Sequence, residues 1–328
     1  MRIFTEGAEM GDYLFWDSVG AYVALQTGRS GNWCYYNWYR YSGFTKDISA
    51  LSELYLRVAF YPTTTIEQTW VVNFYNGGTS VASVVPSSQK LHYYAGTDDL
   101  GNSDTFSLSV WHLLEVHLKI ADSPDGVFTV KLDGITDMDY SGDTLRTAYS
   151  TVNKLYFDSR EMGFDDLALN DTTGDFDNSW CGDGHVVKIT PSGSGTLNEF
   201  SNSGGTSTSN NYLYVDEFGH DSDTTYVYSS GSIIGTKQDQ YKMSSFSVSG
   251  AVIKRIFPIT TVRKTQAGDN YFKLGYLPNG GTVQLSGSIP ASLIYGRYAG
   301  TSASTNPVTG LPWTNSEVSN LEYVIEKE

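Results

Sequence analysis

Short runs of alternating apolar and polar residues recur along the chain and predict β-strands. Leucine, valine and phenylalanine occupy every second position between Glu53 and Tyr61, and the same alternation appears within Trp111–Ile120. This period of two is typical of a strand with one buried face. Turn sequences such as Asn76-Gly-Gly separate the runs at intervals of about 8–12 residues, a spacing typical of β-sandwiches.

A polar stretch near the middle of the chain divides these strands into two sets. Phe164–Leu169 predicts the closing strand of the first set, and residues 171–178 then contain no aliphatic side chain. His185–Thr190 predicts a new strand, which Pro191 should end. We therefore predict an all-β chain with two β-sandwich (jelly-roll-like) domains in tandem, residues 1–171 and 172–328.

The C-terminal end is the one place where the pattern indicates a helical turn. Thr314 is followed three residues later by Glu317, which is the spacing of a capping box. Leu321, Tyr323 and Ile325 then alternate with polar residues and predict a last strand.

Composition narrows the classes of partner. The chain has 328 residues, a formal net charge of −15, and 24 tyrosines. An acidic surface repels phosphate backbones and anionic lipids, so we expect neither nucleic acid nor a membrane as partner. The two cysteines, Cys34 and Cys181, predict buried, reduced thiols rather than a disulfide framework. The first residues lack a secretory-signal pattern, so we expect folding in a cytoplasm.

Three segments resemble concanavalin A-like, laminin-G-like jelly rolls: GAEMGDYLFWD, VWHLLEVHLKIADSPDGVFTVKLDG and FDDLALNDTTG. Three further stretches are similar to bacteriophage virion proteins that join such a jelly roll to a second β-sandwich: DDLALNDTTGDFDNSWCGDGHVVKITPSGSGTLNEFS, DSDTTYVYSSGSIIGTKQDQY and NPVTGLPWTNSEVSNLEY. The resemblance implies a structural protein of a tail, fibre or capsid surface. Other virion proteins, further copies of the chain and a host-surface glycan would be its partners. It would be assembled in the host cytoplasm and located in the virion.

The sequence contains none of the familiar catalytic motifs. We find no Gly-x-Ser-x-Gly, no His-Glu-x-x-His, and no pair of strand carboxylates at the spacing of a jelly-roll glycosidase. We therefore predict that the chain is not an enzyme and acts in virion assembly or host attachment. A carbohydrate-binding receptor-recognition module is the alternative, and a glycan-degrading depolymerase is a further alternative, since acids from separate strands can converge.

The resemblance also implies a structural calcium ion, because related sandwiches often hold one where the first and last strands meet. The candidate ligands in this sequence are Glu9, Asp12, Asp165 and Asp166. Ca²⁺ takes six to eight oxygen ligands from carboxylates and carbonyls. The alternative is that these acids cap turns and accept hydrogen bonds from backbone N–H groups.

Aromatic residues are crowded between Trp33 and Tyr41 and suggest a sugar-stacking surface. Alternate residues of a strand point to opposite faces, so Trp33, Tyr35 and Tyr39 could form one platform. The alternative is that these rings fill the sandwich core, because buried aromatic side chains are common there. The sequence leaves open which face meets solvent.

Overall fold

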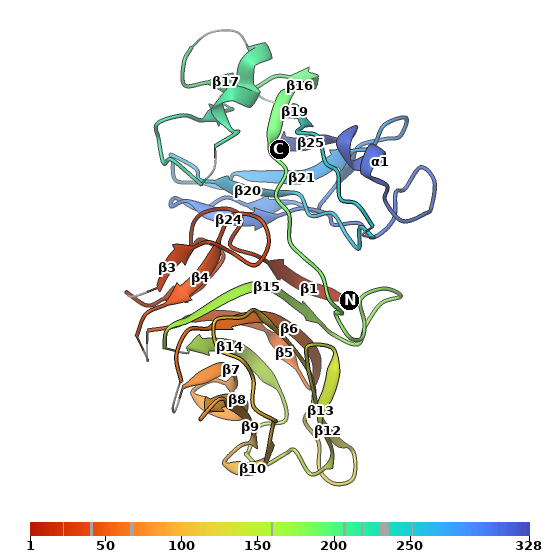
Figure 1. Cartoon of the computed structure of the whole chain (residues 1–328). Coiled ribbons are helices and arrows are strands. Elements are labelled where there is room, and N and C mark those ends of the chain that lie inside the picture. Colours follow the sequence, from red (N-terminus) through yellow and green to blue (C-terminus); the bar gives the residue numbers. More distant parts are fainter. Residues whose placement is uncertain are drawn as a thin grey trace. The chain divides into compact units, whose positions relative to one another are not determined.

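Figure 1 shows a computed structural model of the chain. It describes residues 1–21, 23–39, 42–65, 69–158, 160–205, 208–217, 219–229, 236–250 and 252–328. The chain divides into two compact units, Met1–Lys188 and Ile189–Glu328.

Two antiparallel sheets form unit 1 in the described residues. The first has the spatial order β13 (Ile135–Gly142), β12 (Gly126–Leu132), β11 (His112–Lys119), β6 (Glu53–Pro62), β15 (Met162–Asn170), β4 (Cys34–Asn37) and β3 (Val23–Gln26), with β1 (Arg2–Glu6) also paired to β15. The second has the order β10 (Asp98–Asn102), β9 (Lys90–Ala95), β8 (Thr79–Ser87), β7 (Trp70–Asn76), β14 (Val152–Asp158), β5 (Phe44–Leu51) and β2 (Ser18–Val19).

The core of unit 1 lies between these two sheets. On β6, the alternating residues Leu54 and Phe60 are fully buried. Aromatic pairs connect the sheets: the rings of Phe44 and Phe164 are 5.4 Å apart, and those of Phe157 and Phe164 are 6.0 Å apart. Interdigitated side chains from two facing sheets define a sandwich.

Unit 2 is built around one larger sheet. Within the described residues its order is β16 (Pro191–Asn198), β19 (Lys237–Met243), β25 (Glu322–Lys327), β21 (Tyr271–Leu277) and β22 (Gln284–Leu285), with β23 (Ile289–Pro290) also paired to β21. The remaining elements are short: β17 (Ser201–Asn202), the 3₁₀ helix η1 (Thr208–Tyr214), β18 (Val227–Tyr228), β20 (Ile259–Val262), β24 (Gly296–Ala299) and α1 (Asn315–Ser319).

One face of this sheet carries the core of unit 2. Phe272 and Leu274 of β21 pack with Ile325 of β25, and Val262 and Tyr298 from the β20–β24 ribbon pack against them. The ribbon thus forms a partial second layer, which makes the unit sandwich-like.

The structure confirms the all-β prediction and its sandwich-like domains. It also confirms the capping box, in which the Thr314 side chain accepts from Glu317 N and the Glu317 side chain accepts from Thr314 N. The predicted strand at His185–Thr190 is wrong, because the strand begins at Pro191 instead. A proline suits the first residue of an edge strand, where its missing N–H is not needed, and β16 lies at the edge of its sheet.

The boundary between the compact units differs from the predicted domain boundary. Residues 172–188 belong to unit 1, which ends at Lys188 and not at Asp171. Whether either half folds by itself stays a prediction.

Candidate functional site

The predicted acidic candidates lie where β1 and the last strand of unit 1 meet, since β1 pairs with β15. Asp165 is fully buried, and its Oδ2 accepts hydrogen bonds from the backbone N–H groups of Arg29 at 2.7 Å and Ser30 at 3.3 Å. The Glu9 carboxylate accepts from the backbone N–H of Asn32 at 3.1 and 3.2 Å. These acids therefore hold the loop between β3 and β4 in place.

Asp166 connects three parts of unit 1. Its backbone has a φ of 49°, at an irregularity in the pairing of β15 with β6. Its carboxylate pairs with the Arg29 guanidinium at 3.2 Å and accepts from the Ser30 hydroxyl at 2.9 Å. It also contacts His185 Nδ1 at 3.0 Å and accepts from Val186 N at 2.8 Å. With this left-handed backbone, the Asp166 carboxylate reaches both the Arg29–Ser30 loop and the segment of His185 and Val186.

The burial and hydrogen bonds of these acids show how well they suit a calcium ion. Burial raises the pKa of Asp165, and the charge of Asp166 raises it further. Burial also raises the pKa of Glu9. Asp12 Oδ1 accepts from Leu14 N at 2.9 Å, as a turn-capping residue does. Among the described residues, no three or more His, Cys, Asp or Glu side chains are grouped to hold a metal ion. The geometry favours the hydrogen-bonding alternative, and calcium at these acids stays a prediction.

The three predicted aromatic candidates do not share one open face. Tyr35 is fully buried in the core of unit 1, where its hydroxyl donates to Glu6 Oε1 at 2.9 Å. Trp33 is partly buried against the same core. Tyr39 is 56% exposed and lies beyond Asn37, the last residue of β4. Tyr35 therefore belongs to the core, and only Tyr39 retains a largely exposed ring.

Neighbouring residues form an aromatic row on the other face of the same sheet. Tyr36 of β4 lies opposite Gly163 of β15, and Gly163 lies opposite Tyr61 of β6. The Tyr61 ring is 5.3 Å from that of Trp111, and the Tyr36 ring is 4.6 Å from that of Trp38. The sequence neighbours of this row are buried in the core: Tyr35, Phe60 and Phe164. Alternation therefore directs the row away from the core.

We call Tyr36, Trp38, Tyr61 and Trp111 the aromatic strip. Tyr36 lies on β4 and Tyr61 on β6, the two strands that flank β15 in the sheet, while Trp38 follows the end of β4 and Trp111 precedes the start of β11. Gly163 lies beneath the middle of the strip, and a Cβ atom there would be 3.4 Å from the Trp111 ring. The Tyr36 and Trp38 rings are tilted by 60° to each other, and the Tyr61 and Trp111 rings by 47°. Trp38 is 45% exposed, whereas Tyr36 is buried beneath it.

The chain itself covers another part of this sheet face. The backbone N–H of Gly182 donates to Glu115 on β11 at 2.6 Å, and its carbonyl accepts from Arg57 on β6 at 3.1 Å. Cys181 is buried beside them, 3.6 Å from the carbonyl oxygen of Tyr55. We call residues 179–186 the covering segment.

The Trp180 ring packs on the part of the sheet face that the covering segment covers. The ring is 5.7 Å from Tyr55 and 6.0 Å from His117, and the Lys131 ammonium lies 3.9 Å from its centre. Tyr55 and His117 are themselves stacked, 4.1 Å apart. The outer face of this sheet thus has a part sealed by the covering segment and a part with partly exposed aromatic rings.

Partly exposed aromatic rings suit ligands with an apolar face and polar edges. Aromatic rings carry a negative face and offer a large contact area, which favours polarised C–H groups stacked on them. The sequence did not identify Tyr61 and Trp111 as candidate binding residues. Their alternation with Phe60 and His112 was visible, but their meeting across two strands depends on register.

In the described part of the chain, no helix has the length and apolar composition needed to cross a bilayer.

No protein-family model and no curated protein matches the chain. Solved structures similar to it include the cellulose-induced protein Cip1, with 18% identity and a TM-score of 0.43 over 55% of this chain and 100% of that one. The endo-β-1,4-glucuronan lyase of the fungus Trichoderma reesei has 13% identity and a TM-score of 0.39, over 52% and 95% of the two chains. A Trypanosoma rangeli sialidase has 9% identity and a TM-score of 0.37, over 46% of this chain and 26% of that one.

Similarity at this level concerns the all-β fold alone. The prediction that the chain is not an enzyme is nevertheless contradicted, because structures of similar fold include a lyase and a sialidase. We withdraw that prediction, although the fold by itself assigns no reaction to this chain.

Proposed function

We propose that unit 1 binds a neutral glycan on the aromatic strip. The observation that carries this proposal is the set of partly exposed rings on one sheet face, at β4, at β6 and beside the start of β11, with Gly163 of β15 between them. Adjacent strands are 4.7–4.9 Å apart, so the strip extends over three spacings, roughly 14 Å. That length suits several linked sugar rings better than a single one.

The negative charge of the chain favours neutral glycans over acidic ones. The chain carries a formal net charge of −15, which repels polyanionic sugars over the Debye length. A neutral polysaccharide meets no such repulsion, and its sugar rings present C–H groups to the tyrosine and tryptophan faces. We therefore expect neutral chains to bind better than uronate-containing chains of the same length.

The test measures binding of neutral and uronate oligosaccharides of increasing length by isothermal titration calorimetry. Trp111→Ala and Tyr61→Ala each remove one ring of the strip. Losing one stacked ring costs about 1.4 kcal/mol, so each variant should bind about tenfold more weakly. Tyr149→Ala is the matched control, since Tyr149 is 41% exposed but lies outside the strip. Affinity should rise with length up to the extent of the strip.

Two results would contradict this function. The first is equal affinity of Trp111→Ala, Tyr61→Ala and the unchanged protein for every glycan bound. The second is an equal loss in Tyr149→Ala. Reducing ends measured in the same samples distinguish binding from cleavage.

The virion location implied by the sequence resemblance is a separate prediction. It includes other virion proteins and further copies of the chain as partners, and a host-surface glycan as the ligand. Antibody labelling of intact phage particles tests it, and a protein absent from particles would refute it.

A further inference from the structure

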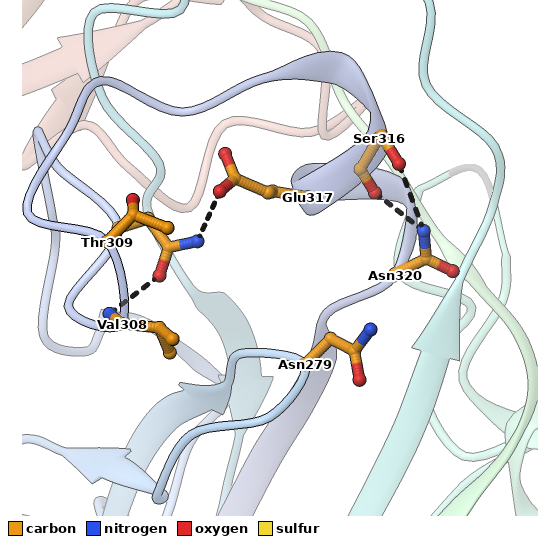
Figure 2. Close-up of a pocket in the computed structure, with 7 residues that line it drawn as sticks. Asn279, Val308, Thr309, Ser316, Glu317 and Asn320 are labelled. Carbon is orange, nitrogen blue, oxygen red and sulfur yellow. Dashed lines mark hydrogen bonds between the residues drawn. The ribbon is translucent and has the colours of Figure 1, made fainter.

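Unit 2 contains a small polar pocket of its own. It lies between the turn after β21, the loop that follows Asn306, and α1, and its volume is about 120 Å³. Figure 2 shows Asn279, Thr309, Ser316 and Glu317 arranged around the opening, with Val308 as the apolar part of the wall. Amide, hydroxyl and carboxylate groups thus surround one space.

The far wall of the pocket is held rigidly. Asn306 is 4% exposed, and its amide donates to Glu317 Oε1 at 2.8 Å while its Oδ1 accepts from Val308 N at 2.9 Å. Glu317 Oε2 also accepts from the backbone N–H of Thr314 at 2.8 Å. These bonds to Thr314 lower the pKa of Glu317, so the carboxylate stays charged at neutral pH. Asn306 and Glu317 are therefore held in place before a ligand arrives, whereas Asn279, Thr309 and Ser316 are exposed.

Asn279 offers a donor and an acceptor at the mouth. It follows Pro278 in a turn closed by the hydrogen bond from Gly281 N to the Pro278 carbonyl at 3.0 Å, with Gly280 at a φ of 75°. Asn279 is exposed, and among the described residues no side chain or backbone group hydrogen-bonds to its amide. A fixed backbone with an unengaged amide is suited to a polar ligand.

Size limits the ligand. A volume of about 120 Å³ holds a small cluster of water molecules. Pockets for drug-sized ligands and cofactors are about 300–1,000 Å³. A nucleotide or an extended chain is therefore too large, whereas the hydroxyl-bearing edge of one sugar ring can enter.

We propose that this pocket binds a single neutral sugar residue through its vicinal hydroxyl groups. The Asn279 amide and the Glu317 carboxylate would take hydroxyls at the mouth and at the far wall, while Val308 contacts ring C–H groups. The charge of Glu317 repels an acidic sugar. With one carboxylate the pocket lacks the several anionic oxygens that a hard cation prefers. The site lies wholly in unit 2 and does not depend on the aromatic strip.

The test uses the full chain and titrates glucose, galactose, mannose and N-acetylglucosamine by ligand-observed NMR, with glucuronate and galacturonate as charged counterparts. At least one neutral sugar should bind, and its charged counterpart should bind several-fold more weakly. Asn279→Ala should weaken binding about fivefold, the effect of one lost hydrogen bond. Asn210→Ala is the matched control, because Asn210 is exposed in η1 and outside the pocket. Trp111→Ala should leave this binding unchanged, which separates it from the function proposed for unit 1.

Glu317→Gln tests the charge: glutamine keeps one oxygen to accept from Thr314 N–H, and its amide nitrogen replaces the oxygen that accepts from Asn306. This substitution should narrow the difference between a neutral sugar and its uronate. The proposal is overturned if no neutral sugar binds, if Asn279→Ala binds as well as the unchanged protein, or if Asn210→Ala loses as much. An unchanged preference in Glu317→Gln would overturn the role of the carboxylate.

Discussion

A fragment that ends at Asn170 should be much less stable than one that ends at Lys188. The shorter fragment lacks the covering segment, which supplies hydrogen bonds to three buried charged groups. Asp166 loses Val186 N–H, while Glu115 and Arg57 lose the N–H and the carbonyl of Gly182. The exposed fractions of these three side chains are now only 0%, 5% and 4%, respectively.

The size of the effect follows from these contacts. A buried polar group left without its partner costs about 1–3 kcal/mol. Water reaches the exposed groups once the segment is missing, so we take the lower end, about 1 kcal/mol for each of the three groups. The sum of about 3 kcal/mol is a large part of a typical stability of 5–15 kcal/mol. For a domain of this size, it lowers the melting temperature by about 6–12 °C.

Urea unfolding and thermal melts of three fragments measure the difference. Met1–Lys188 provides the reference. Met1–Asn178 is the control, because it keeps Asp171 and Asp177 beside the N-terminal residues but lacks the covering segment. It should be destabilised nearly as much as Met1–Asn170. Equal urea midpoints for Met1–Asn178 and Met1–Lys188 would refute the reasoning.

Three further predictions concern the acids of unit 1. The pKa of Asp165 is raised from 3.8 to about 8, so the folded state keeps a proton that the unfolded chain has lost. The stability that this proton contributes is present below about pH 4 and is lost as the pH rises through about 8. The urea midpoint of Asp165→Asn should therefore decline less with rising pH than that of the unchanged protein. An identical decline in both proteins would argue against a raised pKa of Asp165. Tyr35→Phe removes the hydroxyl that donates to buried Glu6, which should cost about 1.5–3 kcal/mol in urea unfolding, and a loss below 0.5 kcal/mol would be too small for such a bond. If calcium binds at these acids, EDTA should lower the melting temperature, because an ion bound only to the native state stabilises it, and Glu9→Gln, Asp166→Asn should abolish that fall. Equal melting temperatures with and without EDTA would leave Glu9 and Asp165 only their hydrogen bonds from backbone N–H groups.

Local patterns in the sequence were sufficient for much of the fold. Alternation located β6 and β11, and the spacing of Thr314 and Glu317 located α1, because each signal depends on residues close in sequence. The covering segment gave no such signal. Gly182 binds through its backbone N–H and carbonyl, which every residue type except proline has, so its polar surroundings resembled a linker.

The candidate sites depended on long-range register. The sequence placed Trp33 and Tyr35 on a common face but gave no means of deciding that Tyr35 faces the core. The aromatic strip requires Tyr36 opposite Gly163 and Gly163 opposite Tyr61, pairings of residues more than 100 positions apart. A shift of one residue in either pairing would turn the rings to the other face.

The alkylation rates of the two buried thiols measure how often unit 1 opens locally. Burial raises the pKa of Cys34 to about 12 and that of Cys181 to about 11. At pH 7 the reactive thiolate is then roughly 10⁻⁵ to 10⁻⁴ of each thiol, against a few per cent for an ordinary cysteine. Alkylation therefore has to wait for an opening event. Cys181 lies in the covering segment and Cys34 in β4, so the two labelling rates distinguish detachment of that segment from separation of the strands, without any introduced probe.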